Sequence, residues 1–171
     1  FQITREKQDK FALKSQEKAL TTRKKNKFKE EIISYKIKSK KADVEFNIDE
    51  HPREGINLDA LSRLKPVFKN DGTVTAGNAS GINDGAAAVM VMTASKAKDL
   101  GLKPMAKIVS YASAGVDPKI MGTGPIPATS ICLDKAGWKA SELDRIEANE
   151  AFAAQAMSVN DSLGLDKSKV N

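Results

Sequence analysis

The first segment of the chain has the spacing of a surface helix. Residues 4 to about 24 contain no Gly or Pro. Their apolar or small positions form one narrow stripe: Phe11, Ala12, Ser15 and Ala19. Thr4 is a suitable N-cap, and Glu6 and Asp9 complement the helix dipole in the first turns. We expect a helix that lies on a larger body, because so thin a stripe stabilises a helix weakly.

Shorter patterns follow this helix. Residues 33–37 alternate apolar and polar side chains, which predicts a half-buried strand with a period of two. The polar stretch 38–52 is expected to be a loop or an irregular hairpin. Residues 56–64 carry leucines on one side and predict a short helix, which Pro66 ends.

From residue 72 onward the chain becomes rich in small and apolar residues. Seven continuous apolar residues, 86–92, predict a strand buried on both faces. Further strands are expected at 107–112 and 145–149, and a single helical turn after Ser141. Helices, each followed by a glycine, are predicted over 95–100, 127–136 and 151–163. Strands that alternate with helices predict a layered α/β fold with a covered sheet.

Composition excludes several classes of protein. The 171 residues are 40% hydrophobic and 29% charged, as in globular proteins. No run of about 18 apolar residues is present, so no transmembrane helix is expected. The single cysteine, Cys132, excludes an internal disulfide, and with the single histidine, His51, it cannot form a Cys/His zinc site. We therefore expect no metal ligands and a cytoplasmic location.

The net positive charge is concentrated in the first third of the chain. Residues 1–54 hold 15 basic and 10 acidic side chains (net +5), and residues 55–171 hold 13 and 12 (net +1). A basic segment suits an anionic ligand or nucleic acid, or is simply a solvated lysine-rich face. Too few aromatic residues lie in this segment to stack nucleic-acid bases.

Candidate chemistry lies in the loops between the expected elements. Residues 77–81 (Gly-Asn-Ala-Ser-Gly) let a ligand approach closely, or only connect two elements. Asn149 either donates to an oxyanion or a water, or caps the next helix. Met121 either forms a ligand-facing wall or lies in the core. Cys132 is expected to be a buried, inert thiol and His51 a surface residue, so the residues alone reveal no complete catalytic constellation.

Four colinear motifs resemble the thiolase family, and within it the acetyl-CoA acetyltransferases. They are residues 73–88 (beginning Thr-Val-Thr-Ala-Gly-Asn-Ala-Ser-Gly), 115–118, 121–127 (Met-Gly-Thr-Gly-Pro-Ile-Pro) and 146–155 (containing Asn-Glu-Ala-Phe-Ala-Ala). The resemblance extends over essentially the whole chain. It implies a layered α-β-α-β-α fold, of which this chain holds a part.

The resemblance also assigns roles to single residues. Asn149 matches the asparagine that holds a water in an oxyanion hole. The positions implied to bind coenzyme A or to line the acyl pocket are Gln16, Arg53, Phe68, Ala76, Ser80, Met121 and Phe152. Among these, Ser80 and Phe68 match residues that contact pantetheine, and Met121 and Phe152 match residues that line the acyl pocket. Arg53 matches the nucleotide end, and Gln16 is assigned there as well.

The implied activity is the condensation of two acetyl-CoA molecules to acetoacetyl-CoA and the reverse thiolysis. Coenzyme A thioesters are then substrates, with no tightly bound cofactor, and the full-length family forms homo-oligomers (dimers of dimers) without nucleic acid or membrane. The implied domains are the end of a loop domain (1–54), the end of the N-terminal domain (55–104) and the start of the C-terminal domain (105–171).

The family's two catalytic cysteines and its histidine match no residue here, so we expect an internal fragment that is inactive alone. A longer-chain 3-ketoacyl-CoA thiolase and a non-catalytic coenzyme A-binding remnant are the alternatives. His51 and Glu54 also depart from the family pattern beside Arg53, and Glu54 places an acid next to the arginine expected to face phosphate.

Overall fold

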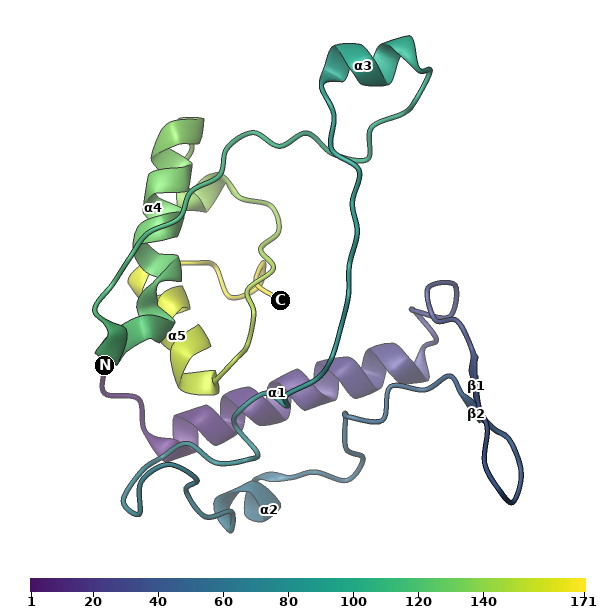
Figure 1. Ribbon diagram of the computed structural model, residues 1–171. Helices are drawn as coiled ribbons and strands as arrows, with labels where there is room; N and C mark the ends of the chain where they lie inside the picture. The colour runs from purple at the N-terminus through teal and green to yellow at the C-terminus, as the bar shows by residue number, and fades with distance from the viewer. The chain divides into compact units, whose positions relative to one another are not determined.

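The computed structural model describes residues 1–171 and divides into two units. Unit 1 comprises residues 1–81 and 150–154, and unit 2 comprises residues 82–149 and 155–171. The elements of unit 1 are α1 (Arg5–Lys24), β1 (Tyr35–Ile37), β2 (Val44–Phe46) and α2 (Leu58–Ser62). Residues 82–171 hold α3 (Ala94–Asp99), η1 (Pro118–Thr123), α4 (Pro125–Ala136), η2 (Ala140–Glu142) and α5 (Ala153–Ser162) (Figure 1).

Helix α1 begins where the capping pattern predicts, because the Thr4 side chain accepts a hydrogen bond from the backbone N–H of Lys7. The predicted apolar stripe is only partly correct. The buried residues of α1 are Gln8, Asp9 and Ala12, and Ala19 is exposed. The buried face is mostly polar because it packs against a loop whose backbone and side chains require hydrogen bonds.

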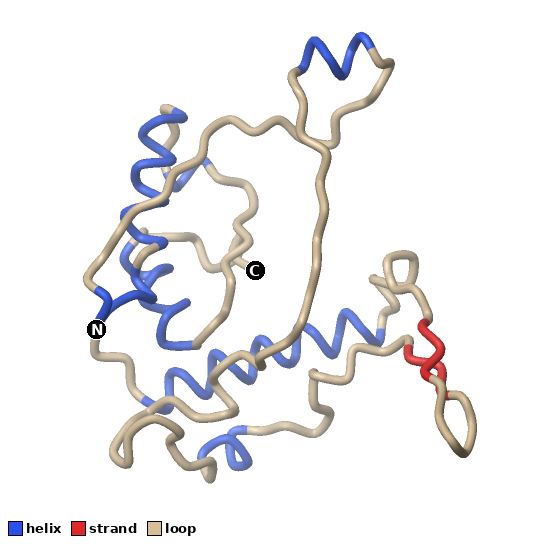
Figure 2. The backbone as a smooth tube through the Cα atoms, viewed as in Figure 1, coloured by secondary structure: helices blue, strands red, loops and turns tan.

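The strand expected near residue 35 exists, but its predicted burial is wrong. β1 pairs antiparallel with β2, with Tyr35 opposite Phe46, so the stretch 38–52, expected to be a loop or an irregular hairpin, supplies the second strand of a hairpin. Every residue of both strands is exposed. Two strands of three residues have no further layer to cover them, and Figure 2 shows strand only in this hairpin.

The strands predicted at 86–92 and 107–112 are wrong for this chain. Both segments are irregular and largely exposed, and Met90 is 83% exposed (Figure 2). A strand requires a neighbour for its backbone hydrogen bonds, and no segment of this chain pairs with either one. At 145–149 the expected strand is reduced to one parallel bridge between Ile146 and Val170.

The helices of residues 82–171 follow the sequence predictions to within about two residues at most ends. α4 ends at Gly137, whose φ of +70° is the left-handed conformation that glycine adopts without strain. The single turn expected after Ser141 is present as η2, but it begins before that residue, at Ala140. Its N-cap is Lys139, whose backbone N–H donates to the Glu142 carboxylate at 2.7 Å. None of the helices combines the length and apolar character needed to cross a bilayer.

Candidate functional site

A buried asparagine organises the loop of residues 73–80 in unit 1. Asn78 is only 3% exposed. Its Oδ1 accepts from the backbone N–H of Thr75 at 2.8 Å, and its Nδ2 donates to the Thr73 carbonyl and to Asp9 Oδ1, each at 3.0 Å. The loop therefore holds its shape through one side chain that also ties it to α1.

Arg5 balances the charge of Asp9. Its Nε donates to Asp9 Oδ2 at 2.7 Å, and its Nη2 donates to the carbonyls of Leu61 and Leu64 at 2.6 and 3.0 Å. Gln8, one residue before Asp9, donates to Thr73 Oγ1 at 2.9 Å. A partly buried network of hydrogen bonds thus joins α1, the end of α2 and the 73–80 loop.

The glycine of this loop is required by close packing. A Cβ atom at Gly77 would lie 2.5 Å from Leu61 Cδ2 and 2.6 Å from Leu64 Cδ1. Since Leu61 is fully buried, its side chain has little freedom to retreat. The close approach expected at residues 77–81 is therefore made in this structure by leucine side chains of the chain itself, while Ala76 and Ser80 are exposed.

Residues 150–154 pair with this loop within unit 1. The Ser80 N–H donates to the Ala151 carbonyl and the Ala153 N–H to the Asn78 carbonyl, both at 2.9 Å, and an antiparallel bridge joins Ala79 to Phe152. At the start of this segment, Ser15 Oγ of α1 donates to the Glu150 carboxylate at 2.5 Å.

Two aromatic rings meet beside the paired segments. The ring centroids of Phe68 and Phe152 lie 6.2 Å apart in an edge-to-face arrangement. Phe68 is carried by a turn that an antiparallel bridge between Pro66 and Thr75 closes, and it is 72% exposed. The rings of Phe68 and Phe152, which lie far apart in the sequence, therefore meet beside a loop whose backbone at Ser80 pairs with Ala151.

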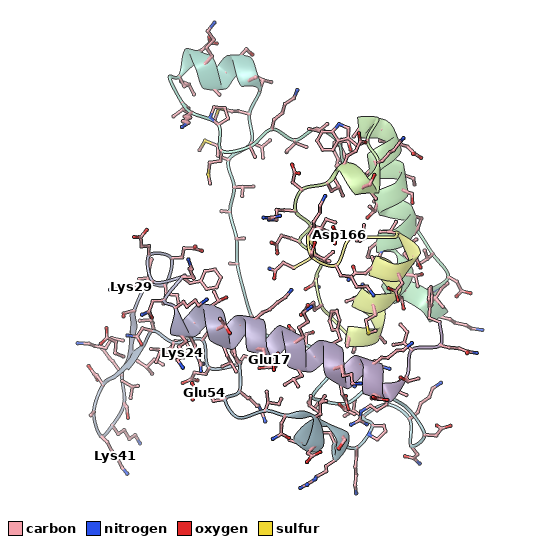
Figure 3. All side chains as sticks on the ribbon, turned by 180° about the vertical axis from the view of Figure 1, so that it is seen from behind. Glu17, Lys24, Lys29, Lys41, Glu54 and Asp166 are labelled. Carbon is pink, nitrogen blue, oxygen red and sulfur yellow. The ribbon has the colours of Figure 1, made fainter.

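A second group of expected residues lies at the C-terminal end of α1. The Gln16 side-chain oxygen accepts from the backbone N–H of Arg53 at 3.0 Å, so these two residues are in contact. The guanidinium of Arg53 is exposed and forms no ion pair. Glu54 is paired elsewhere, since Arg23 Nη2 donates to its Oε1 at 2.7 Å. Figure 3 shows Glu54 close to this end of α1, where Lys24 is also labelled.

Asn149, the expected catalytic residue, lies in unit 2 and does not cap α5. That helix begins four residues later, at Ala153, so the capping alternative is wrong. The Asn149 side chain is exposed and forms no hydrogen bond within the chain. Its backbone follows a short parallel pairing in which the Ala148 N–H donates to the Asn171 carbonyl at 2.8 Å.

The turn before this pairing contains a carboxylate with a shifted pKa. Asp166 accepts from Ser168 Oγ at 2.7 Å and from the Ser168 N–H at 2.9 Å. These hydrogen bonds stabilise the charged form, the side-chain bond most strongly, and lower the pKa of Asp166 below its usual value. Asp166 is labelled in Figure 3.

Met121, Cys132 and His51 differ in how far they are buried. Met121 lies in η1 and is 75% exposed, so it is not a core residue. Cys132 lies in α4 but is only half-buried, which corrects the expectation of a buried thiol. Its Sγ is 2.9 Å from Ser110 Oγ. His51 is on the surface, as expected.

The structure therefore forms two groups within unit 1: Phe68, Ser80 and Phe152 in one, Gln16 and Arg53 in the other. Ala76 shares a loop with Ser80. The sequence did not predict that Asn78 organises the 73–80 loop or that Arg23 pairs with Glu54. Asn78 lies in the Gly-Asn-Ala-Ser-Gly segment that the sequence indicates. Its contact with Asp9 spans 69 residues and that of Arg23 with Glu54 spans 31, so neither leaves a pattern in the local sequence.

Comparisons with known proteins agree on one family. Residues 1–95 match the thiolase N-terminal domain, and residues 102–171 match the thiolase C-terminal domain. The acetyl-CoA acetyltransferase of Allochromatium vinosum is 61% identical over 170 residues, which are 99% of this chain and 43% of that protein. The chain thus spans less than half the length of this curated relative.

Solved structures support the same fold. The Bacillus anthracis acetyl-CoA acetyltransferase matches with a TM-score of 0.91 and 50% identity, over 99% of this chain and 43% of that one. Human mitochondrial 3-ketoacyl-CoA thiolase in complex with CoA matches with a TM-score of 0.88 and 45% identity, over 98% of this chain and 41% of that one. The path of this chain is therefore that of part of a thiolase fold, which confirms the expected fold class although most of the expected strands are absent.

Proposed function

The chain belongs to the thiolase family, and we propose that it forms part of an acetyl-CoA acetyltransferase. The proposed reaction joins two acetyl-CoA molecules into acetoacetyl-CoA and coenzyme A. A bond forms between the α-carbon of one acetyl group and the carbonyl carbon of the other. The carbon–sulfur bond of the second thioester breaks, and the thiolate that leaves takes up a proton equivalent to the one lost from the α-carbon. Thiolysis is the reverse.

The observation that carries this proposal is the contact between the rings of Phe68 and Phe152, next to the loop that carries Ser80. Pantetheine is a long, narrow chain of methylene groups and amides, so its binding requires apolar contact area and a few hydrogen-bonding groups. Two exposed rings 6.2 Å apart supply the first, and the Ser80 hydroxyl supplies the second. Ala76 has a small side chain on the same loop, which lets a ligand approach the backbone closely.

Arg53 is proposed to attract the nucleotide phosphates of coenzyme A. Its guanidinium is exposed and unpaired, and Gln16 holds its backbone. The neighbouring acid Glu54, a departure from the family pattern, is engaged by Arg23 and so competes less for Arg53. Met121 is proposed to line the acyl pocket, since its flexible thioether side chain is exposed.

Asn149 is proposed to act on the reacting thioester carbonyl. As carbon–carbon bond formation proceeds, negative charge develops on the carbonyl oxygen, and a hydrogen-bond donor or a held water stabilises it. The Asn149 amide has no partner within the chain that would compete for this role. Cys132 is not proposed as the nucleophile, because no basic side chain contacts its half-buried Sγ.

The test is an assay of the complete protein. Acetoacetyl-CoA and coenzyme A are mixed with it, and the loss of acetoacetyl-CoA absorbance is followed. The proposed function predicts thiolysis with turnover typical of enzymes. Absence of thiolysis and of condensation in the complete, folded protein would reject the function and favour a non-catalytic coenzyme A-binding role.

A longer-chain 3-ketoacyl-CoA thiolase is the second candidate. The observation that favours it is the similarity to human mitochondrial 3-ketoacyl-CoA thiolase, at 45% identity. The ratio of kcat/KM for acetoacetyl-CoA to that for a 3-ketoacyl-CoA of ten or more carbons distinguishes the two. The short-chain proposal predicts a ratio well above one.

The finer features of the enzyme are proposals as well. We propose the three-part domain division at residues 54 and 104, a cytoplasmic location and a homo-oligomer built as a dimer of dimers. The absence of a disulfide partner for Cys132 is compatible with a reducing compartment. Light scattering of the complete protein in solution measures its oligomeric state.

A further inference from the structure

Two side chains of α1 hold the segment of residues 49–54. Gln16 and Arg23 are seven residues apart, which places them two helical turns apart on the same face of the helix. Gln16 accepts from the backbone N–H of Arg53. Arg23 contacts the same segment at three points, so the nucleotide end of the proposed site is built on this face of α1.

Arg23 contacts the segment of residues 49–54 at both of its ends and so fixes it against α1. Its Nη1 donates to the carbonyl of Asp49 at 2.9 Å and lies 3.4 Å from the carbonyl of Pro52, and its Nη2 donates to Glu54 Oε1 at 2.7 Å. A guanidinium presents its donors in a fixed plane, so these contacts constrain the orientation of the segment as well as its position.

The ion pair between Arg23 and Glu54 also affects the charge around the neighbouring Arg53. Glu54 directly follows Arg53, and its side chain is 83% exposed. Without a partner, its carboxylate would repel phosphate and could pair with Arg53. With Arg23 engaged on Glu54, the guanidinium of Arg53 has no ion pair.

From this arrangement we propose that Arg23 is a positioning residue for nucleotide recognition: it clamps residues 49–54 onto α1 and neutralises Glu54, so that Arg53 is free to bind the phosphates of coenzyme A. This inference rests on the proposed function. Arg23 acts through Glu54 and the backbone of the segment, and both of its terminal nitrogens, Nη1 and Nη2, donate to acceptors within the chain.

The test compares two substrates of the complete enzyme. Acetyl-CoA carries the nucleotide, and S-acetyl-pantetheine lacks it, so only the first requires Arg53. KM and kcat are measured for both substrates with the parent enzyme and with Arg23→Ala. Lys24→Ala is the matched control, because it removes the same charge from the adjacent position, and the Lys24 side chain forms no hydrogen bond or ion pair in the structure.

The proposal predicts that Arg23→Ala raises KM for acetyl-CoA by about 3- to 10-fold, the size expected for weakening one partly exposed charge contact. Its kcat and its KM for S-acetyl-pantetheine stay as in the parent, which also shows that the variant is folded. Adding Glu54→Gln to Arg23→Ala lowers the KM for acetyl-CoA again, because the unpaired carboxylate is removed. Lys24→Ala changes KM for acetyl-CoA by less than about twofold.

Three results would overturn the proposal: an unchanged KM for acetyl-CoA in Arg23→Ala, an equal rise for both substrates, or an equal effect of Lys24→Ala. These results are distinct from a failure of the proposed function. In that case the parent enzyme turns over neither thioester, whereas here the parent is active and only the variant comparison fails.

Discussion

The side-chain amide of Asn78 donates a 3.0 Å hydrogen bond to the carboxylate of Asp9, across 69 residues of sequence. Both side chains are buried, and the other oxygen of the carboxylate accepts from Arg5. The contact joins the first turns of α1 to the loop that carries Ser80. The geometry of the proposed pantetheine site therefore depends on a residue near the beginning of the chain.

Replacement of Asn78 by alanine is expected to destabilise the complete protein by about 2–3 kcal/mol, because it leaves Asp9 Oδ1 and the Thr75 N–H without their hydrogen-bond partner. Chemical denaturation monitored by circular dichroism measures the loss. Asn83→Ala is the control, since Asn83 is exposed and forms no hydrogen bond. Equal midpoints for the two variants would contradict the importance of the buried network.

A methyl group at residue 77 is expected to cost about 1–3 kcal/mol, through overpacking against the leucines of the α2 segment. Gly77→Ala should lower the thermal midpoint, whereas Gly85→Ala should not, because a Cβ at Gly85 meets nothing within 4 Å. Leu64→Ala should partly rescue Gly77→Ala by opening space. A Gly77→Ala variant as stable as the parent would show that the leucines can move aside.

Loss of the Asn149 amide is expected to reduce kcat by about 10²–10³, the usual effect of removing one oxyanion donor, with a much smaller change in KM. Steady-state thiolysis of acetoacetyl-CoA by Asn149→Ala in the complete enzyme checks this. Because Asn149 does not cap α5, the thermal midpoint should stay close to that of the parent. A kcat within a few-fold of the parent would remove Asn149 from the catalytic groups.

Replacement of Arg53 by alanine is expected to raise KM for acetyl-CoA by about 3- to 10-fold while sparing kcat. The difference between variant and parent should shrink at high salt, because exposed charge contacts are screened. Arg63→Ala, at another exposed arginine without an ion pair, serves as the control. If KM is unchanged at low ionic strength, Arg53 does not contact the nucleotide.

The pKa of Asp166 is expected to rise toward its usual value of 3.8 when Ser168 is replaced by alanine, since the side-chain hydrogen bond that lowers it is lost. A carboxyl whose folded-state pKa is depressed stabilises the fold above its unfolded pKa, and this contribution disappears as the pH falls through the folded pKa. The stability difference between parent and Ser168→Ala should therefore be present above about pH 4 and shrink below it. NMR titration of the carboxyl carbon measures the shift, and identical titration curves would contradict the assignment.

Local sequence was sufficient for the helices and for naming the family. Thr4 caps α1 and Gly137 ends α4, because capping depends on residues within a few positions of the helix end. The resemblance also indicates Phe68, Ser80 and Phe152, and the structure places the rings of Phe68 and Phe152 in contact beside the loop that carries Ser80. The helix ends depend on interactions between residues close in sequence, and the family is indicated by the motifs alone.

Only the tertiary structure decided which side chains are buried and which charges are paired. The pattern of residues 86–92 indicated a strand, yet strand formation depends on a neighbour that periodicity cannot supply, and Met90 is exposed here. The sequence placed Glu54 beside Arg53, whereas the fold pairs it with Arg23, 31 residues away. Ion pairs and buried hydrogen bonds act over a few ångströms in space, so their partners are set by how the chain folds back on itself rather than by order along it.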